Sequence, residues 1–118
     1  MTIAALQSID GLDLKTGLTN CMDDEQLYKD VISMFVIQLD QDIPMVRQFY
    51  NTQDWIGLGK ACHGIKGAAA SVGAHKVQDA SAELEKAGKE NNGDVINSQF
   101  EQYIVLLESF KAQISAAI

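Results

Sequence analysis

The sequence predicts an all-α protein, an antiparallel up-and-down four-helix bundle with short additional helices at the N-terminus. Three observations lead to this prediction. Apolar residues recur every three to four positions along most of the chain, segments that alternate like β-strands are scarce, and there is a single proline. The length of 118 residues suits one domain, residues 1–118, with one hydrophobic core.

Residues 1–22 are predicted to form a short helix and a loop laid over one end of the bundle, because leucines recur there at short intervals. The first long helix is expected over residues 23–50. Asp23 or Asp24 can cap its start, and Pro44 should kink or restart it. Its core-facing stripe consists of Tyr28, Ile32, Phe35, Leu39, Ile43, Val46 and Phe49.

The second long helix is predicted over residues 53–72, with Thr52 as its N-cap. Gly73 follows at the position where a left-handed residue commonly ends a helix, which makes it a structural glycine. A seam with alternating spacings of four and three residues identifies the side that faces the core. This seam consists of Leu58, Cys62, Ile65, Ala69 and Val72.

Two further helices are expected over residues 75–90 and 94–116. The segment Asn91-Asn92-Gly93 separates them, and Asp94 can cap the second. Apolar positions in the last helix repeat at strict intervals of four and three residues, as in the seam of a packed bundle. Because the connections between these helices are short, successive helices should run antiparallel.

Composition narrows the range of functions. A net charge of −7 argues against nucleic-acid binding, which needs a basic footprint, and no apolar run approaches the ~20 residues of a membrane span. We therefore expect a soluble, cytoplasmic protein that binds neither nucleic acid nor membrane. Cys21 and Cys62 lack the spacing of a metal site or a disulfide and should be reduced. Because no second exposed apolar stripe is obvious, we expect a monomer.

Basic and acidic residues are unevenly distributed along the chain. Residues 55–78 contain Lys60, Lys66 and Lys76 but no Asp or Glu, so this stretch carries +3 and the remainder −10. A basic island in an acidic protein indicates a site for an anion, or a surface that steers an acidic partner. The alternative is a helix that lacks acids by chance.

His63 lies within this island, and helical geometry places it on the surface. At 100° per residue, the apolar seam lies roughly 100° to 180° away from His63. Lys60 and Lys66 flank the imidazole, and Gly59 and Gly67 lie one turn before and after it. Glycine costs about 0.8 to 1 kcal/mol relative to alanine in a helix interior, so the four glycines of this helix indicate that a bare surface is needed.

An exposed imidazole with a neighbouring lysine suits the transfer of a phosphoryl group. Neutral imidazole, with a reference pKa of about 6.5, is a nucleophile at neutral pH without a separate base. Lys66 can pair with phosphoryl oxygens, and the glycines leave room for a partner that brings its acceptor and metal in line. Residues 57–60 lack the spacing of a nucleotide-binding loop, so the phosphoryl group must come from elsewhere.

The run containing His63, Lys66 and Gly67, followed by Gly73-Ala74 and later by Leu84-Glu85, closely resembles a known family signature. It is that of the histidine-containing phosphotransfer (HPt) domains of multistep two-component phosphorelays, which reads H-x-L-K-G, then G, then L-E or L-Q. The resemblance covers nearly the whole chain. It implies a helical phosphocarrier without an ATP site or kinase activity of its own, and thus not an enzyme.

The resemblance also implies a role for each residue of the motif. His63 would accept a phosphoryl group from a receiver-domain aspartate through Nε2 and pass it to another receiver aspartate. Lys66 would stabilise the phosphoryl charge, Gly67 would permit docking, and Glu85 would hold the other imidazole nitrogen. Ala68 stands where a hydroxyl residue is frequent in the family, so a hydroxyl contribution is not expected.

The implied partners are response-regulator receiver domains, with a hybrid sensor histidine kinase as a further candidate. No cofactor is expected to be bound to this chain, and the Mg²⁺ that phosphoryl transfer requires would be supplied by the receiver. The surface that docks the receiver is expected to consist of Gly59, Lys60, Gly64, Gly67 and Ala70.

Other interpretations of these residues remain open. A metal site built from Cys62, His63 and His75 is disfavoured, because adjacent helical residues point about 100° apart. A helical adaptor without chemistry would explain the bundle but not the histidine with its lysine and glycines. His75, at a helix start, is expected to serve in capping or solvent contact. Glu85 could be merely solvated, but its place beside Leu84 at the edge of the seam lets it reach a neighbouring helix.

Overall fold

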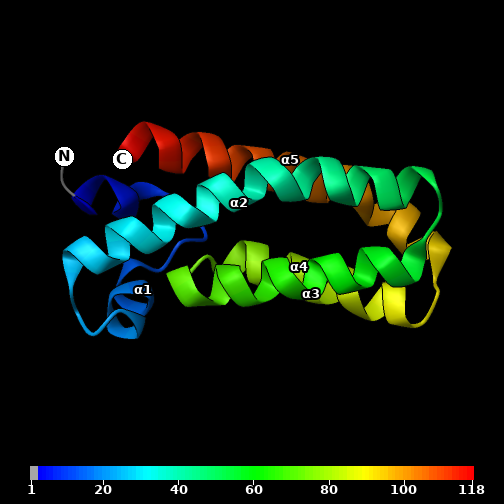
Figure 1. Ribbon diagram of the computed structural model, residues 1–118, viewed down its shortest axis with the longest axis horizontal. Coiled ribbons are helices and arrows are strands. Elements are labelled where there is room, and N and C mark those ends of the chain that lie inside the picture. The colour runs from blue at the N-terminus through cyan, green and yellow to red at the C-terminus, as the bar shows by residue number, and fades with distance from the viewer. Residues whose placement is uncertain (1–2) are drawn as a thin grey trace.

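The computed structural model describes residues 3–118, and every regular element in that range is a helix (Figure 1). Met1 and Thr2, at the start of the predicted N-terminal segment, lie outside the described residues. The elements are the 3-10 helix η1 (Ile3–Ser8), the short helix α1 (Leu14–Asn20), and four long helices, α2 (Glu25–Asn51), α3 (Trp55–Val72), α4 (His75–Lys89) and α5 (Gly93–Ala117). The long helices run alternately in opposite directions, which confirms the predicted four-helix bundle with N-terminal additions.

Polar side chains cap the starts of the long helices α2 and α5. Asp24 caps α2, as one of the two predicted alternatives, because its carboxylate accepts from two amides of the first turn. At α5 the prediction that Asp94 caps the helix is wrong. Asn92 accepts from a first-turn amide at 3.2 Å, and Asp94 already lies inside the helix. The difference arises because the chain reverses at Asn91, which has a φ of 52°, and so the helix starts earlier.

The start of α3 also differs from the prediction. Thr52 is the C-cap of α2 and not the N-cap of α3. Gln53 adopts a left-handed conformation with a φ of 58°, so the chain changes direction after Thr52. Asp54 is therefore the residue that reaches the first turn of α3, where its carboxylate accepts from the Gly57 N–H at 2.9 Å.

Helix α2 continues through Pro44 without a break, so the predicted restart does not occur. Proline cannot donate a hydrogen bond to the carbonyl four residues earlier, which is that of Asp40. Both Asp40 and Pro44 are exposed, so water can satisfy this carbonyl on the outer side of the helix. The continuous helix keeps its core-facing stripe in register over its full length.

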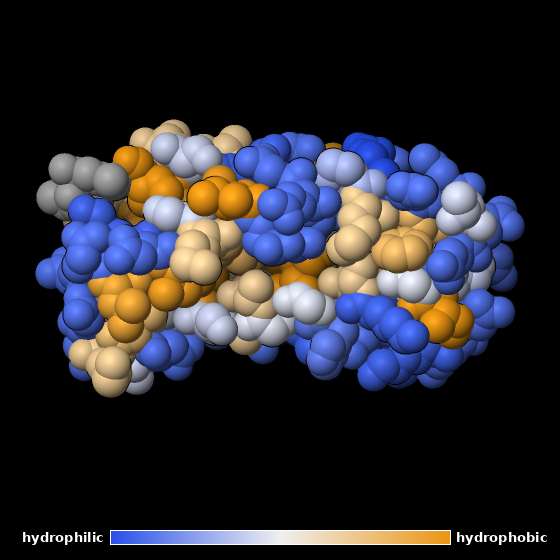
Figure 2. Space-filling model, viewed as in Figure 1, coloured by the Kyte–Doolittle hydropathy of each residue, from blue (hydrophilic) through white to orange (hydrophobic). Residues whose placement is uncertain are grey.

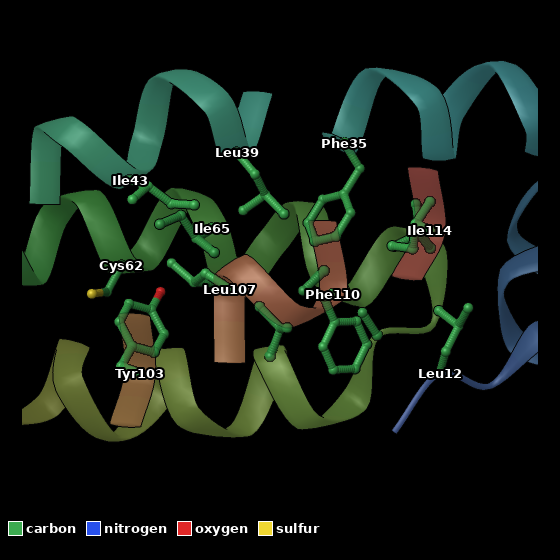
Figure 3. Close-up of a cluster of buried hydrophobic side chains, with 14 of the residues drawn as sticks. Leu12, Phe35, Leu39, Ile43, Cys62, Ile65, Tyr103, Leu107, Phe110 and Ile114 are labelled. Atoms are coloured by element: carbon green, nitrogen blue, oxygen red, sulfur yellow. The ribbon is translucent and has the colours of Figure 1, made fainter. Parts of the chain in front are cut away.

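The predicted apolar stripes meet in a single core between α2, α3, α4 and α5 (Figure 3). Leu39 and Ile43 of α2 face Ile65 of α3, and Leu107 and Phe110 of α5 close the same layer. Both cysteines are free and buried. Within residues 3–118, no helix is both long and apolar enough to cross a membrane.

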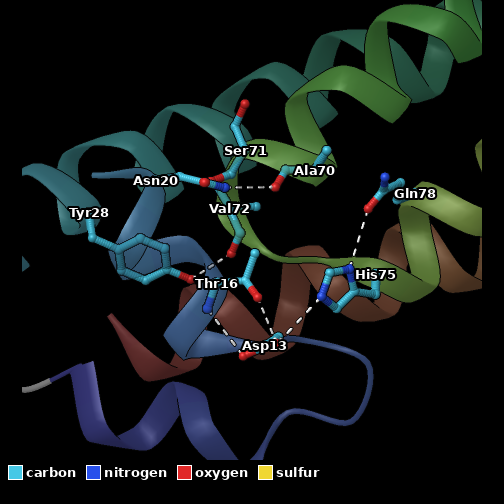
Figure 4. Close-up of polar contacts among 9 residues, drawn as sticks. All are labelled: Asp13, Thr16, Asn20, Tyr28, Ala70, Ser71, Val72, His75 and Gln78. Carbon is cyan, nitrogen blue, oxygen red and sulfur yellow. Dashed lines mark hydrogen bonds and ion pairs between the residues drawn. The ribbon is translucent and has the colours of Figure 1, made fainter. Parts of the chain in front are cut away.

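The N-terminal elements hold the turn between α3 and α4 (Figure 4). Gly73 ends α3 in the predicted left-handed conformation, with a φ of 82°, and its carbonyl accepts from the Asp13 N–H at 2.7 Å. The Tyr28 hydroxyl donates to the Val72 carbonyl at 2.9 Å, and the Asp13 carboxylate lies 3.5 Å from Nε2 of His75. The end of α3 and the start of α4 are thereby fixed against α1 and α2.

Helix α3 packs most extensively against α4, and two glycines allow their backbones to approach closely. A Cβ atom added at Gly88 would lie 2.6 Å from the Trp55 carbonyl oxygen and 2.7 Å from the Gly59 Cα. Gly59 is buried in this interface, so its predicted place on the bare docking surface is wrong. Helical geometry correctly places Gly59 one turn before His63 on α3, but in the fold α4 covers that turn.

Several apolar side chains on α2 remain exposed. Met34, Ile37 and Met45 are 66%, 60% and 40% exposed, and apolar residues reach the surface near α1 and the first half of α2 (Figure 2). Their spacing places them on one side of the helix. Exposed Gln38 and Gln41 lie between them on the same side, so they do not form a continuous apolar stripe, and the monomer stays a prediction.

We expect Gly88→Ala to lower the free energy of unfolding by about 1–3 kcal/mol, because the added methyl group forces α3 and α4 apart. This is a net loss, because the cost of separating the helices should exceed the ~1 kcal/mol that alanine gains in helix propensity. Chemical denaturation monitored by circular dichroism measures the change. Gly64→Ala is the matched control, since a Cβ at Gly64 has no described atom within 4 Å, and it should be stabilising. Equal stabilisation by both substitutions would contradict the close-packing interpretation.

Candidate functional site

His63 projects from the middle of α3 into solvent, as predicted. Its side chain is 67% exposed, whereas the adjacent Cys62 is fully buried in the core. The two side chains thus leave the helix on different sides. Within residues 3–118, no group of three or more His, Cys, Asp and Glu side chains is arranged to hold a metal ion.

Glu85 of α4 holds the inner nitrogen of this imidazole. Its Oε2 lies 2.7 Å from Nδ1 of His63, and the residue is only 4% exposed. An ionised carboxylate can only accept a hydrogen bond, so Nδ1 must carry the proton. In the neutral imidazole the other ring nitrogen, Nε2, then has its lone pair available for attack. The contact that the resemblance implied is therefore present, and Glu85 is not simply solvated.

Two lysines share the same carboxylate with His63. The ammonium of Lys66 lies 2.5 Å from Oε1 of Glu85, and that of Lys89 lies 3.1 Å from Oε2. Hydrogen bonding from Lys66 lowers the pKa of Glu85 from 4.5 to about 2, with smaller contributions from Lys89 and His63, and against the opposing effect of burial. Glu85 is therefore ionised throughout the neutral pH range.

Lys66 is partly buried and is paired within the chain. Its side chain is 32% exposed, and its ammonium is engaged by Glu85. Along the chain, the stretch around His63 contains no acidic residue. The fold brings Glu85 into that stretch from the next helix, so the lysine beside His63 already has an anionic partner.

The outer surface of α3 is bare around the histidine. Lys60, His63, Gly64 and Gly67 are all exposed, and Ala70 is half-buried. A Cβ atom at either exposed glycine would have no described atom within 4 Å. Three of the five predicted docking residues thus lie on an open surface, Ala70 is partly covered, and Gly59 lies in the helix interface.

Two residues near His63 were not predicted. Ile56 is 47% exposed, and with Lys89 it lines a surface hollow beside the imidazole. Lys89 had a signal in the sequence, because a glutamate followed by a lysine four residues later commonly pairs on a helix. Ile56 had none, because a partly exposed apolar residue in the first turn of a helix is ordinary.

His75 lies at the other end of α3, at the turn into α4. Its ring nitrogens face the Asp13 carboxylate at 3.5 Å and the Gln78 side-chain oxygen at 3.3 Å. These contacts belong to the start of α4 and not to the environment of His63. The predicted structural use of His75 agrees with this placement.

The fold and the site together define a helical phosphotransfer module: a four-helix bundle with an outward imidazole oriented by a buried carboxylate. A family model for the Hpt domain matches residues 30–117. The chain therefore belongs to the Hpt domain family, as its motif indicated. Hpt domains are phosphocarriers in phosphorelays, lack kinase activity of their own and interact with receiver domains of response regulators. Comparisons with curated proteins and with solved structures found no match.

We expect Glu85→Gln to lower the free energy of unfolding by about 1–3 kcal/mol at pH 7, because charge-assisted hydrogen bonds to a buried group are lost. The folded-state pKa of Glu85, about 2, lies below its usual value of 4.5, so ionised Glu85 stabilises the fold above pH 4.5. That contribution is lost as the pH falls from about 4.5 to about 2, and the difference between variant and wild type should shrink over this interval.

Urea denaturation at a series of pH values measures this difference. Glu83→Gln, which removes an exposed carboxylate from the same helix, is the matched control and should leave the pH dependence close to that of wild type. A difference between Glu85→Gln and wild type that stays constant from pH 7 to pH 2 would show that the ionised carboxylate does not stabilise the fold.

Proposed function

We propose that His63 accepts a phosphoryl group from the phosphorylated aspartate of one receiver domain and passes it to the aspartate of another. The observation that carries this proposal is the 2.7 Å contact between Nδ1 of His63 and Oε2 of Glu85. It holds Nδ1 against Glu85 and leaves Nε2 of an exposed imidazole free to face solvent, where a receiver can approach. The carrier is expected to act in the cytoplasm as a monomer.

Transfer begins when the lone pair of Nε2 attacks the phosphorus of the aspartyl phosphate. The new P–N bond forms as the P–O bond to the aspartate breaks, and the electron pair of that bond leaves with the carboxylate. Because Nδ1 keeps its proton, the phosphorylated ring carries a positive charge. Glu85 lies against that charge at 2.7 Å and stabilises it. The same steps in reverse, with the carboxylate of the second receiver's aspartate as the attacking group, deliver the phosphoryl group to that receiver.

The surface around His63 suits a receiver's active site. Gly64 and Gly67 have no side chains that would hold a partner away, and Lys60 offers a positive charge to an acidic pocket. Mg²⁺ would be held by the receiver, whose carboxylates are the ligands it prefers. A hybrid sensor kinase that carries a receiver domain would be recognised through the same surface.

A helical adaptor without chemistry is the second candidate function. The bundle and its exposed apolar residues on α2 would serve an adaptor equally well. The buried Glu85 favours the carrier, because burying a carboxylate costs free energy unless it is paired, and here its pairing orients an exposed nucleophile.

We expect the wild-type chain, incubated with a phosphorylated receiver domain and Mg²⁺, to gain one phosphoryl group that is acid-labile and base-stable. His63→Gln should gain none, and His75→Gln, the matched control, should behave as wild type. Intact-protein mass spectrometry and autoradiography of gels treated with acid or base measure the transfer. Absence of phosphate on the wild-type chain with several receivers would favour the adaptor.

Gly67→Leu should weaken binding to a receiver domain by about tenfold or more, because the new side chain would stand between the two surfaces. The free energy of unfolding should not fall and should rise by up to about 1 kcal/mol, because a glycine is removed from a helix. Isothermal titration calorimetry and denaturation measure the two effects. Ala112→Leu, at an exposed position on α5, is the control. Unchanged receiver affinity in Gly67→Leu would remove this surface from the interface.

A further inference from the structure

We infer that Lys89 is a positioning residue that keeps Glu85 paired when Lys66 turns from Glu85 to a phosphoryl group on His63. This inference deepens the proposed function and rests on it, because it concerns the phosphorylated form. It assigns Lys89 a role that the signature motif does not contain.

Lys66 faces two competing anions once His63 is phosphorylated. In the structure its ammonium is held 2.5 Å from Oε1 of Glu85. A phosphoryl group on Nε2 would add up to two negative charges one helical turn away on the same helix. An ammonium is a single positive charge, so pairing closely with the phosphoryl oxygens weakens its pairing with the carboxylate.

Glu85 cannot lose its cation without cost. Its side chain is only 6% exposed, so water cannot replace a departing ammonium. Removing one partner from a buried ion pair is strongly destabilising, because the remaining charge is left uncompensated. If Lys89 were absent, the hydrogen bond from His63 alone would oppose this cost.

Lys89 is placed to compensate this charge. It lies one turn after Glu85 on α4, with its ammonium 3.1 Å from Oε2, and its side chain is 73% exposed. An exposed lysine side chain has the freedom to move from Oε2 towards Oε1. Each of the two anions is then paired with one lysine: Lys89 pairs with the Glu85 carboxylate, and Lys66 pairs with the phosphoryl group.

Neighbouring lysines do not fulfil this role. Lys86, one turn before Lys89, is exposed and makes no ion pair with Glu85 among those of the described residues. Lys60 lies on the other side of His63 along α3. Lys86 therefore offers a control that carries the same charge at a nearby position on the same helix.

The test uses the full chain phosphorylated chemically, without a receiver. Phosphoramidate is the donor: Nε2 attacks its phosphorus, the P–N bond of the reagent breaks, and the leaving nitrogen takes a proton from water and departs as ammonia. Mass spectrometry confirms the modification of His63. The second ionisation of the phosphoryl group is then followed by its ³¹P chemical shift as a function of pH.

A nearby ammonium favours the dianionic phosphoryl group, so the acid dissociation constant reports how closely Lys66 approaches it. We expect Lys89→Gln to reduce this constant about two- to fivefold, the range for an exposed ion pair. Lys66→Gln should reduce it at least as much, and Lys66→Gln/Lys89→Gln no further than Lys66→Gln alone. Lys89→Arg should restore the wild-type value, and Lys86→Gln should leave it unchanged.

Three results would overturn the inference. The first is a wild-type constant in Lys89→Gln, and the second is an equal reduction in Lys86→Gln, which would indicate a general effect of charge. The third is an undiminished effect of Lys89→Gln in the Lys66→Gln background, which would mean that Lys89 acts on the phosphoryl group directly. Failure of receivers to exchange phosphate with the chain would contradict the proposed function and leave this measurement intact.

If phosphoramidate does not modify His63, the unphosphorylated chain provides a second measurement. Without Lys89, Lys66 is the one ammonium group left on Glu85 among the described ion pairs, so Lys66 should react about two- to fivefold more slowly with an amine-acylating reagent. Peptide mass spectrometry quantifies the labelling, again with Lys86→Gln as the control. Unchanged labelling of Lys66 in Lys89→Gln would overturn the inference by this route as well.

Discussion

The hydrogen bond between His63 of α3 and Glu85 of α4 is the interaction around which the candidate site is built. It crosses the interface between two antiparallel helices at 2.7 Å, and it can do so because Gly59 and Gly88 let the two backbones come close one turn away. Side chains at these two positions would separate the helices and draw the carboxylate away from the imidazole. The orientation of an exposed imidazole thus depends on the packing of a buried interface.

A carboxylate in that interface has to be compensated, and the compensation shapes the whole site. Lys66 and Lys89 both reach Glu85, so the carboxylate accepts from an imidazole and two ammonium groups. The site is therefore a network of shared charges and not a nucleophile with an independent lysine beside it. A change of charge at Nε2 must alter the balance at Glu85, and through Glu85 it must alter both lysines.

Features that depend on a single helix could be predicted from the sequence. The apolar seams, the left-handed Gly73 and the exposure of His63 all follow from helical periodicity and from the preference of one residue. Features that depend on a neighbouring helix could not. Gly59 has the same angular position on its helix whether solvent or α4 covers it, and the carboxylate that pairs with Lys66 comes from another helix. The prediction of Thr52 as the N-cap of α3 is wrong because Gln53 is left-handed and α3 therefore begins after Asp54.

The register of α3 against α4 explains why Glu85 faces His63. At one end the turn is held by the hydrogen bond from the Asp13 N–H to the Gly73 carbonyl. Asp13 and α1, which it caps, precede the part of the chain that matches the family. At the other end, Gly59 and Gly88 lie in contact. The His63–Glu85 pair lies between these two points. A slide of one helix along the other would have to break the turn or separate the glycines, so the imidazole is oriented by constraints on both sides of it.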